Sequence, residues 1–108
     1  MDFKELAENL ELEENEFLEL IGLFIKTAYS DLNKLQSAIE DVDTDKVARF
    51  AHSIKGTSSN LGLIGIFECA KRIEMSVQNN DLDGVTGAAK RIKEQLDRIA
   101  KALAKNER

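Results

Sequence analysis

The sequence predicts an all-α fold, an antiparallel up-down-up-down four-helix bundle with a short extra helix at the N-terminus. Three observations lead to this prediction. Proline is absent from the 108 residues and aromatic residues make up only 6%, whereas an all-β fold needs turn residues and aromatic or β-branched strands. Apolar residues recur at three- and four-residue steps along most of the chain. The breaks between these periodic stretches are short, which favours antiparallel neighbours.

The first two predicted helices lie in the N-terminal part of the chain. A short helix is expected from Asp2 to about Leu10, because Asp2 and Glu5 have the spacing of a capping box. A long helix is expected from Glu14 to Val42, and acidic residues crowd its start, where the helix dipole favours negative charge. Its apolar stripe consists of Phe17, Ile21, Phe24, Ala28, Leu32, Leu35, Ile39 and Val42.

Two further helices are predicted in the middle of the chain. The segment Asp43-Thr44-Asp45 offers N-cap oxygens for a helix from about Asp45 to Leu61, and Gly62 is placed to end it. The next helix is expected from about Leu63 to Gln78. A turn at Asn79-Asn80-Asp81 closes this part of the chain.

The last predicted helix begins near Leu82 and carries the most regular apolar seam. Its stripe suits near-antiparallel packing and consists of Leu82, Val85, Ala89, Ile92, Leu96, Ile99 and Leu103. The charged segment 101–108 is expected to fray.

Length, charge and cysteine content limit the classes of function. The 108 residues fit a single domain, 1–108, and the net charge of −5 gives no basic footprint for nucleic acid. One cysteine, Cys69, and one histidine, His52, leave no internal disulfide and no ordinary metal cluster, so we expect no bound metal or cofactor. Neither a secretory leader nor an apolar run of membrane-spanning length is found. We therefore expect a cytoplasmic monomer that contacts neither nucleic acid nor membrane.

The helical period places the only histidine, His52, on the solvent side of its helix. With Ile54 set at zero and about 100° per residue, His52 falls at about 160°. The apolar residues of this helix fall within about 60° of Ile54: Val47, Phe50, Ala51 and Leu61. Gly56 lies one turn further along the exposed face, where a glycine costs about 1 kcal/mol relative to alanine and core packing does not explain it. A missing side chain there lets a partner approach the imidazole closely. Lys55 can reach the same patch and stabilise a phosphoryl group.

The residues from His52 to Gly62, HSIKGTSSNLG, resemble the motif of histidine-containing phosphotransfer (HPt) domains. That motif is a histidine, any residue, an aliphatic residue, lysine, glycine, two small residues, then an aliphatic residue and glycine. Thr57 is a minor departure, because Ser or Ala is commoner there. The resemblance covers about residues 12–103. It implies a four-helix bundle whose exposed histidine shuttles phosphoryl groups, with His52 as the phosphoacceptor and with Lys55 and Gly56 in support.

The resemblance also implies partners in a two-component phosphorelay. His52 would accept a phosphoryl group from a receiver-domain aspartate and pass it to another receiver. The expected partners are response-regulator receiver domains, a hybrid sensor histidine kinase, or both, with Mg²⁺ supplied by the receiver. The sequence has neither GxxxxGK[ST] nor GxGxxG, so we expect a carrier without its own ATP site rather than an enzyme. Two alternatives stay open: the histidine-bearing domain of a chemotaxis-type kinase, phosphorylated in trans from ATP, and a helical adaptor whose histidine carries no phosphate.

Four residues are candidates for contact with a partner. Leu20 and Leu23 lie off the core stripe of the long helix, at roughly 80° and 140° from Ala28. They either form an exposed apolar patch or pack beneath the short first helix. Arg49, together with Lys55, is suited to the acidic pocket of a receiver domain, and Ser59 is placed to donate a hydrogen bond.

Overall fold

The computed structural model describes residues 1–106, and this part of the chain contains five α-helices and no strand. The all-α fold class predicted from the sequence is confirmed, and the predicted helix bounds agree to within about two residues, apart from the C-terminal end. The helices are α1 (Phe3–Asn9), α2 (Glu14–Glu40), α3 (Thr44–Asn60), α4 (Ile64–Gln78) and α5 (Leu82–Asn106).

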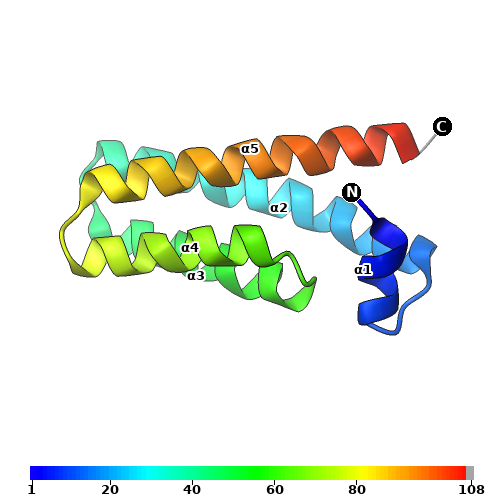
Figure 1. The fold of residues 1–108 in the computed structure, drawn as a ribbon. Helices are drawn as coiled ribbons and strands as arrows, with labels where there is room; N and C mark the ends of the chain where they lie inside the picture. Colours follow the sequence, from blue (N-terminus) through cyan, green and yellow to red (C-terminus); the bar gives the residue numbers. More distant parts are fainter. Residues whose placement is uncertain (107–108) are drawn as a thin grey trace.

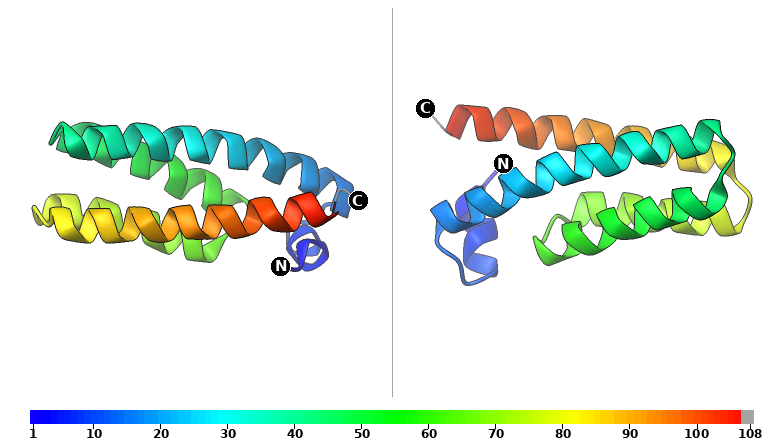
Figure 2. Two further views of the ribbon diagram at one scale, coloured as in Figure 1. Left: turned by 90° about the horizontal axis from the view of Figure 1, so that it is seen from above. Right: turned by 180° about the vertical axis from the view of Figure 1, so that it is seen from behind.

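Short turns reverse the chain between consecutive long helices (Figures 1 and 2). Helix α2 packs against both α3 and α5, and α4 also packs against both of them. The short α1 lies at one end of the molecule and packs on α2. Each long helix therefore packs against two other long helices, and α2 also contacts α1.

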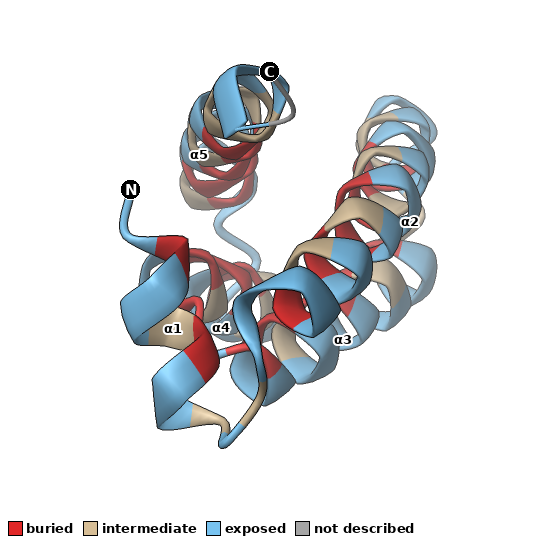
Figure 3. Cartoon of the chain, turned by 90° about the vertical axis from the view of Figure 1, so that its right-hand side faces the viewer, coloured by how far each residue is buried: buried red, intermediate tan, exposed pale blue. Residues whose placement is uncertain are grey.

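The core lies where the four long helices face one another, as the inward-facing buried segments in Figure 3 show. Every long helix contributes side chains with almost no exposed surface, so the helices share one core. The buried hydroxyl of Ser58 donates to the carbonyl oxygen of Ile54 at 2.7 Å and is therefore satisfied. The largest fully buried apolar residues are Phe17, Ile21, Leu32, Leu35, Val47, Ile54, Ile66, Ile73, Val85, Ile92 and Leu96.

The first four helices all end in the same hydrogen-bonded motif. The residue after each helix cap has a left-handed backbone, and the next N–H reaches back five residues, which is the pattern of a Schellman motif. At the end of α3, Leu63 N–H donates to the Ser58 carbonyl at 2.9 Å and Gly62 N–H to the Ser59 carbonyl at 3.1 Å. The prediction that Gly62 ends α3 is thus confirmed. The four left-handed residues are Glu11, Val42, Gly62 and Asn80.

Two residues predicted to lie in the core stripes are exposed. Val42 is 65% exposed, because α2 ends at Glu40 and the left-handed backbone at Val42 (φ 54°) turns its side chain away from the stripe. Leu82 is 37% exposed, because it is the first residue of α5 and extends beyond the part of the helix that its neighbours cover.

The C-terminal helix is longer than the sequence suggests. Fraying was expected from Lys101 onward, but α5 continues to Asn106. Ala102 and Leu103 are partly buried against the core, and this packing holds the last turns in place. The rest of the predicted fraying segment, 107–108, lies outside the described residues.

Replacing Val42 with glycine is expected to raise the free energy of unfolding by roughly 0.5–1 kcal/mol, because a β-branched residue is strained at positive φ and glycine is not. Urea denaturation measures the change. Val42→Ala is the matched control: it removes the side chain but keeps the Cβ atom that causes the strain. Equal stabilisation by glycine and alanine would mean that backbone strain at this position is not the cause.

A polar cluster joins α2 to α5 near the middle of the molecule. The Tyr29 hydroxyl donates to Asp97, and Lys93 Nζ lies 3.0 Å from the other carboxylate oxygen of Asp97. Burial, the hydrogen bond to Asp97 and the negative charge of Asp97 raise the pKa of Tyr29 from 10.0 to about 12. The hydrogen bonds from Tyr29 and Lys93 lower the pKa of Asp97 below its ordinary value. The folded state therefore holds the phenol proton more tightly than the unfolded state does.

Tyr29 is the only tyrosine in the chain, so tyrosinate absorbance reports its ionisation directly. We expect the folded protein to titrate near pH 12 and the urea-unfolded protein near 10. Because the folded-state pKa is the higher one, this contribution to stability is complete below pH 10 and is lost as the pH rises through about 12. In Asp97→Asn the folded-state titration should move back toward 10. An unchanged midpoint in that variant would contradict the role of Asp97.

Candidate functional site

His52 lies on the outer face of α3. The helix begins at the N-cap Asp43, whose carboxylate accepts a hydrogen bond from Lys46 N–H at 3.2 Å. Ala51 and Ile54 point into the core and are fully buried, while 72% of the His52 side chain is exposed. The structure thus places the imidazole on the solvent side, as the helical wheel predicts.

The imidazole faces a carboxylate that comes from the neighbouring helix α4. His52 Nδ1 lies 3.5 Å from Glu74 Oε1, which is too long for a strong hydrogen bond but close enough for a direct electrostatic contact. Lys55 Nζ lies 2.9 Å from the same oxygen. One carboxylate oxygen therefore stands between the lysine and the histidine ring.

This Glu74 oxygen is shielded from solvent, and no donor reaches it with good hydrogen-bond geometry. The Lys55 ammonium is close to this oxygen, but it is not aligned to donate a hydrogen bond to it. The contact is an ion pair, because charge attraction depends only weakly on angle. The oxygen keeps a free lone pair, and His52 Nδ1 is the other nitrogen close to it.

Gly56 lies one turn after His52 and is exposed. A Cβ atom built on Gly56 would meet no atom within 4 Å outside its own stretch of helix. Internal packing therefore does not require a glycine here. The bare backbone leaves open space on the exposed face one turn from His52.

The predicted polar contact residues share the same face of α3. Arg49 and Ser59 are exposed and lie three residues before and seven residues after His52, so they fall in one stripe with Gly56. Next to His52, Ser53 donates a hydrogen bond to Asp31 of α2 at 2.9 Å. This bond ties the histidine-bearing turn of α3 to α2.

An apolar hollow of ≈ 270 Å³ lies between α2 and α3 beside this stripe. Leu20 is 42% exposed and Leu23 is 64% exposed, so the alternative in which they pack beneath the first helix is wrong. The exposed patch is the arrangement that the structure shows. The hollow is lined by Leu20, Leu23, Phe24, Thr27, Thr57, Asn60 and Leu61.

Glu74 and Asp31 are site residues that the sequence analysis missed. Both lie on helices other than that of the histidine, and neither belongs to the HPt motif. The sequence does contain information that could have identified Glu74. If the two helices joined around Gly62 are antiparallel, position 52 lies opposite position 72, and Glu74 is within one turn of that position. This prediction can be made only when it is already known which helices pack against each other.

No group of three or more His, Cys, Asp or Glu side chains among residues 1–106 is placed to hold a metal ion. Over the same residues, no helix is both long enough and apolar enough to cross a membrane.

The fold and site define a class of protein: an all-helical chain that presents a single exposed histidine, flanked by Lys55 and Gly56, on the outer face of one helix. The family model of the Hpt domain matches residues 19–102, and the chain therefore belongs to the Hpt domain family. Comparison with curated proteins and with solved structures finds no further match. Membership in this family indicates histidine phosphotransfer in phosphorelay signalling.

Proposed function

We propose that this protein is a phosphorelay carrier in which His52 receives a phosphoryl group from the phosphoaspartate of one receiver domain and passes it to the aspartate of another. The observation that carries the proposal is the exposed imidazole, which contacts the shielded Glu74 carboxylate on its Nδ1 side and is open to solvent elsewhere. In this proposal α2 to α5 form an antiparallel up-down-up-down bundle, and the chain acts as a monomer in the cytoplasm.

The position of Glu74 favours one tautomer of the neutral imidazole. A neutral ring has one N–H and one lone pair, and a shielded carboxylate oxygen next to Nδ1 stabilises the proton at that nitrogen. The lone pair then lies on Nε2. Our proposal therefore makes Nε2 the phosphate-accepting atom.

The transfer step needs no acid or base from this chain. The Nε2 lone pair attacks the phosphorus of the acyl phosphate, the bond from phosphorus to the aspartate oxygen breaks, and its electron pair returns to the carboxylate. The ring becomes a phosphorylated imidazolium whose positive charge lies near Glu74. Passing the group onward is the same step in reverse. Positioning and charge neutralisation dominate such transfers, and Mg²⁺ with its acidic ligands belongs to the receiver.

Lys55 supplies the cation that this chain contributes. In the resting protein it is paired with Glu74. An arriving phosphoryl group brings more negative charge than a carboxylate, so the ammonium is expected to turn toward it. Glu74 then remains with the imidazolium, and each charge keeps a partner throughout the transfer.

Receiver docking is proposed to cover the hollow between α2 and α3. Leu20 and Leu23 supply exposed apolar surface there, and Arg49 and Ser59 flank the histidine on α3. Apolar contact at the centre provides affinity, whereas charges at the rim chiefly accelerate association.

The experiment is transfer of radiolabel from receiver domains that have been phosphorylated with labelled acetyl phosphate and Mg²⁺. Wild-type protein is expected to gain an acid-labile label, and His52→Gln to gain none while keeping the same circular dichroism melting curve. Label that persists in His52→Gln would refute the proposal.

A further arm distinguishes the two alternatives. Incubation with a separate chemotaxis-type kinase domain and ATP, without any receiver, is expected to leave the protein unlabelled. Labelling under those conditions would favour the trans-phosphorylated alternative. If no receiver labels the chain and His52→Gln leaves signalling output intact, the hypothesis of a helical adaptor whose histidine carries no phosphate would replace the proposal.

A further inference from the structure

A second surface of the molecule, on the side of α4 that faces α5, contains two adjoining depressions of ≈ 370 Å³ and ≈ 350 Å³. They share Gly65, Gln95 and Arg98, so they form one continuous groove, which we call the α4–α5 groove. None of its lining residues belongs to the histidine site or to the hollow between α2 and α3. The groove is therefore a separate feature that the proposed function does not use.

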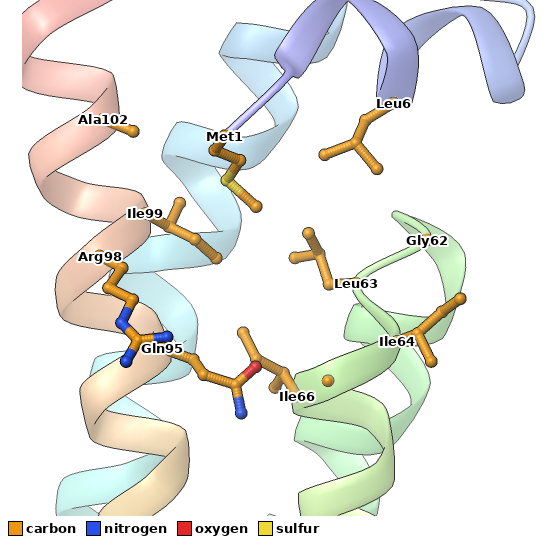
Figure 4. A pocket seen from close by; sticks show the side chains of 11 residues that line it. Met1, Leu6, Gly62, Leu63, Ile64, Ile66, Gln95, Arg98, Ile99 and Ala102 are labelled. Carbon is orange, nitrogen blue, oxygen red and sulfur yellow. The ribbon is translucent and has the colours of Figure 1, made fainter.

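One end of the α4–α5 groove is apolar. Figure 4 shows Met1, Leu6, Leu63 and Ile99 converging on it from three directions, with Gln95 and Arg98 along one edge. Helix α1 covers this end only in part, and Met1 is 63% exposed. The apolar end is of the size of small-molecule pockets, which are mostly apolar with a few polar groups.

In the middle of the groove, the Gln95 amide lies against the bare backbone of Gly65. A Cβ atom on Gly65 would overlap the side-chain oxygen of Gln95, so a larger residue at position 65 would require the flexible Gln95 side chain to move. The amide nitrogen of Gln95 is 3.5 Å from Cys69 Sγ, a weak hydrogen-bond acceptor. Gln95 lines both depressions and thus lies at the boundary between the apolar end and the polar end.

The other end of the groove is cationic. Arg72, Arg91 and Arg98 line it with Glu68 and Glu94, yet within residues 1–106 none of the three guanidinium groups forms an ion pair with a carboxylate. Guanidinium groups bind carboxylates and phosphates through two parallel hydrogen bonds. This end thus offers donors that internal partners do not occupy.

The charge distribution of the whole chain places positive charge on this side. Residues 1–43 contain twelve acidic and three basic residues, whereas residues 64–106, which carry α4 and α5, contain six acidic and eight basic ones. The net charges of these two parts are −9 and +2, although the chain as a whole carries −5. An anion is therefore attracted to the α4–α5 side and repelled by the α1–α2 side.

We propose that the α4–α5 groove binds a small amphiphilic anion, a medium-length acyl chain that ends in a carboxylate. The acyl chain would lie between Leu63 and Ile99, and the carboxylate would be bound by Arg98 with Gln95 beside it. A neutral apolar ligand would leave the guanidinium unpaired, and a small inorganic anion would leave the apolar end empty. Only a ligand that combines both parts uses the whole groove.

The test uses decanoate below its critical micelle concentration, added to isotope-labelled protein and followed by amide chemical shifts. Saturable shifts confined to about residues 1–6, 62–66 and 91–102 are expected, with a Kd of about 1 mM or tighter. Decanol tests the apolar part alone and acetate tests the carboxylate alone, and each should bind at least about tenfold more weakly.

Arg98→Gln is expected to weaken decanoate binding about tenfold or more. Lys90→Gln is the matched control, because it removes one positive charge from the exposed surface of the same helix outside the groove. Equal binding by the wild type and Arg98→Gln would overturn the proposal. So would shifts spread over the whole bundle, or shifts that require anionic phospholipid vesicles and do not occur with monomeric decanoate. Phosphoryl transfer to His52 is measured separately, so failure here would not affect the proposed function.

Discussion

Replacing Gly56 with leucine is expected to make the protein more stable and yet to slow phosphoryl acceptance from a receiver about a hundredfold. Stability should rise by about 1 kcal/mol, because leucine is a far better helix former than glycine and a side chain here meets open space. Transfer should fall because the leucine side chain would occupy the space next to His52 that an approaching partner needs. A displacement of about 1 Å in such a geometry is enough for a hundredfold loss of rate.

A graded series makes this prediction specific. Gly56→Ala adds one carbon atom and should stabilise the protein with only a small loss of rate. Gly87→Leu is the matched control, because Gly87 is also an exposed helical glycine with open space around it but lies on α5, away from the histidine. Both leucine variants should gain similar stability in urea denaturation. Normal transfer by Gly56→Leu would mean that the partner does not approach over this residue.

Replacing Glu74 with leucine is the second large effect, and transfer to His52 is expected to slow about tenfold or more. The variant removes the carboxylate that contacts His52 Nδ1 and pairs with Lys55. The ring then loses its preference for the Nδ1–H tautomer, and the imidazolium formed during transfer loses its nearby negative charge. Lys55 loses the partner that holds it beside the histidine.

The tautomer gives a readout that a merely structural role would not change. Nitrogen chemical shifts of the His52 ring should show the Nδ1–H form predominating in the wild type and a mixture of both forms in Glu74→Leu. Glu68→Leu is the control, because Glu68 is exposed on the same helix and has no ion pair with a residue of the described chain. If the wild type and Glu74→Leu give the same tautomer ratio, Glu74 does not select the attacking nitrogen.

The local parts of the site could be predicted because they depend on one helix. The period of α3 places His52, Gly56 and Ser59 on one exposed face irrespective of what the other helices do. The cap at Asp43 and the stop at Gly62 are likewise set by residues within a few positions of the helix ends. The hydrogen bonds at these two helix ends span three to five residues and need no tertiary contact, so the cap residues Asp43 and Gly62 were sufficient to predict them.

Contacts between helices could not be obtained in this way. Whether Leu20 and Leu23 are exposed or buried depended on where α1 packs. The packing of Ala102 and Leu103 against the core decided that α5 continues to Asn106. Val42 was misplaced for a different reason. Its hydrophobicity matches the α2 stripe, but the Schellman hydrogen bond from Asp43 to Ala38 ends the helix two residues earlier. The periodicity of apolar residues alone does not predict such a hydrogen bond.

The sequence by itself determined that this chain is helical, that it resembles an HPt domain and that its one histidine faces solvent. These properties follow from the spacing of residues along single helices. Only the tertiary structure brought Glu74 of α4 to His52 and Lys55 of α3, because that contact depends on the register and rotation of two packed helices. The same packing placed Gln95 of α5 against Gly65 of α4 in the α4–α5 groove. Side chains from different helices meet only after the core has fixed both axes.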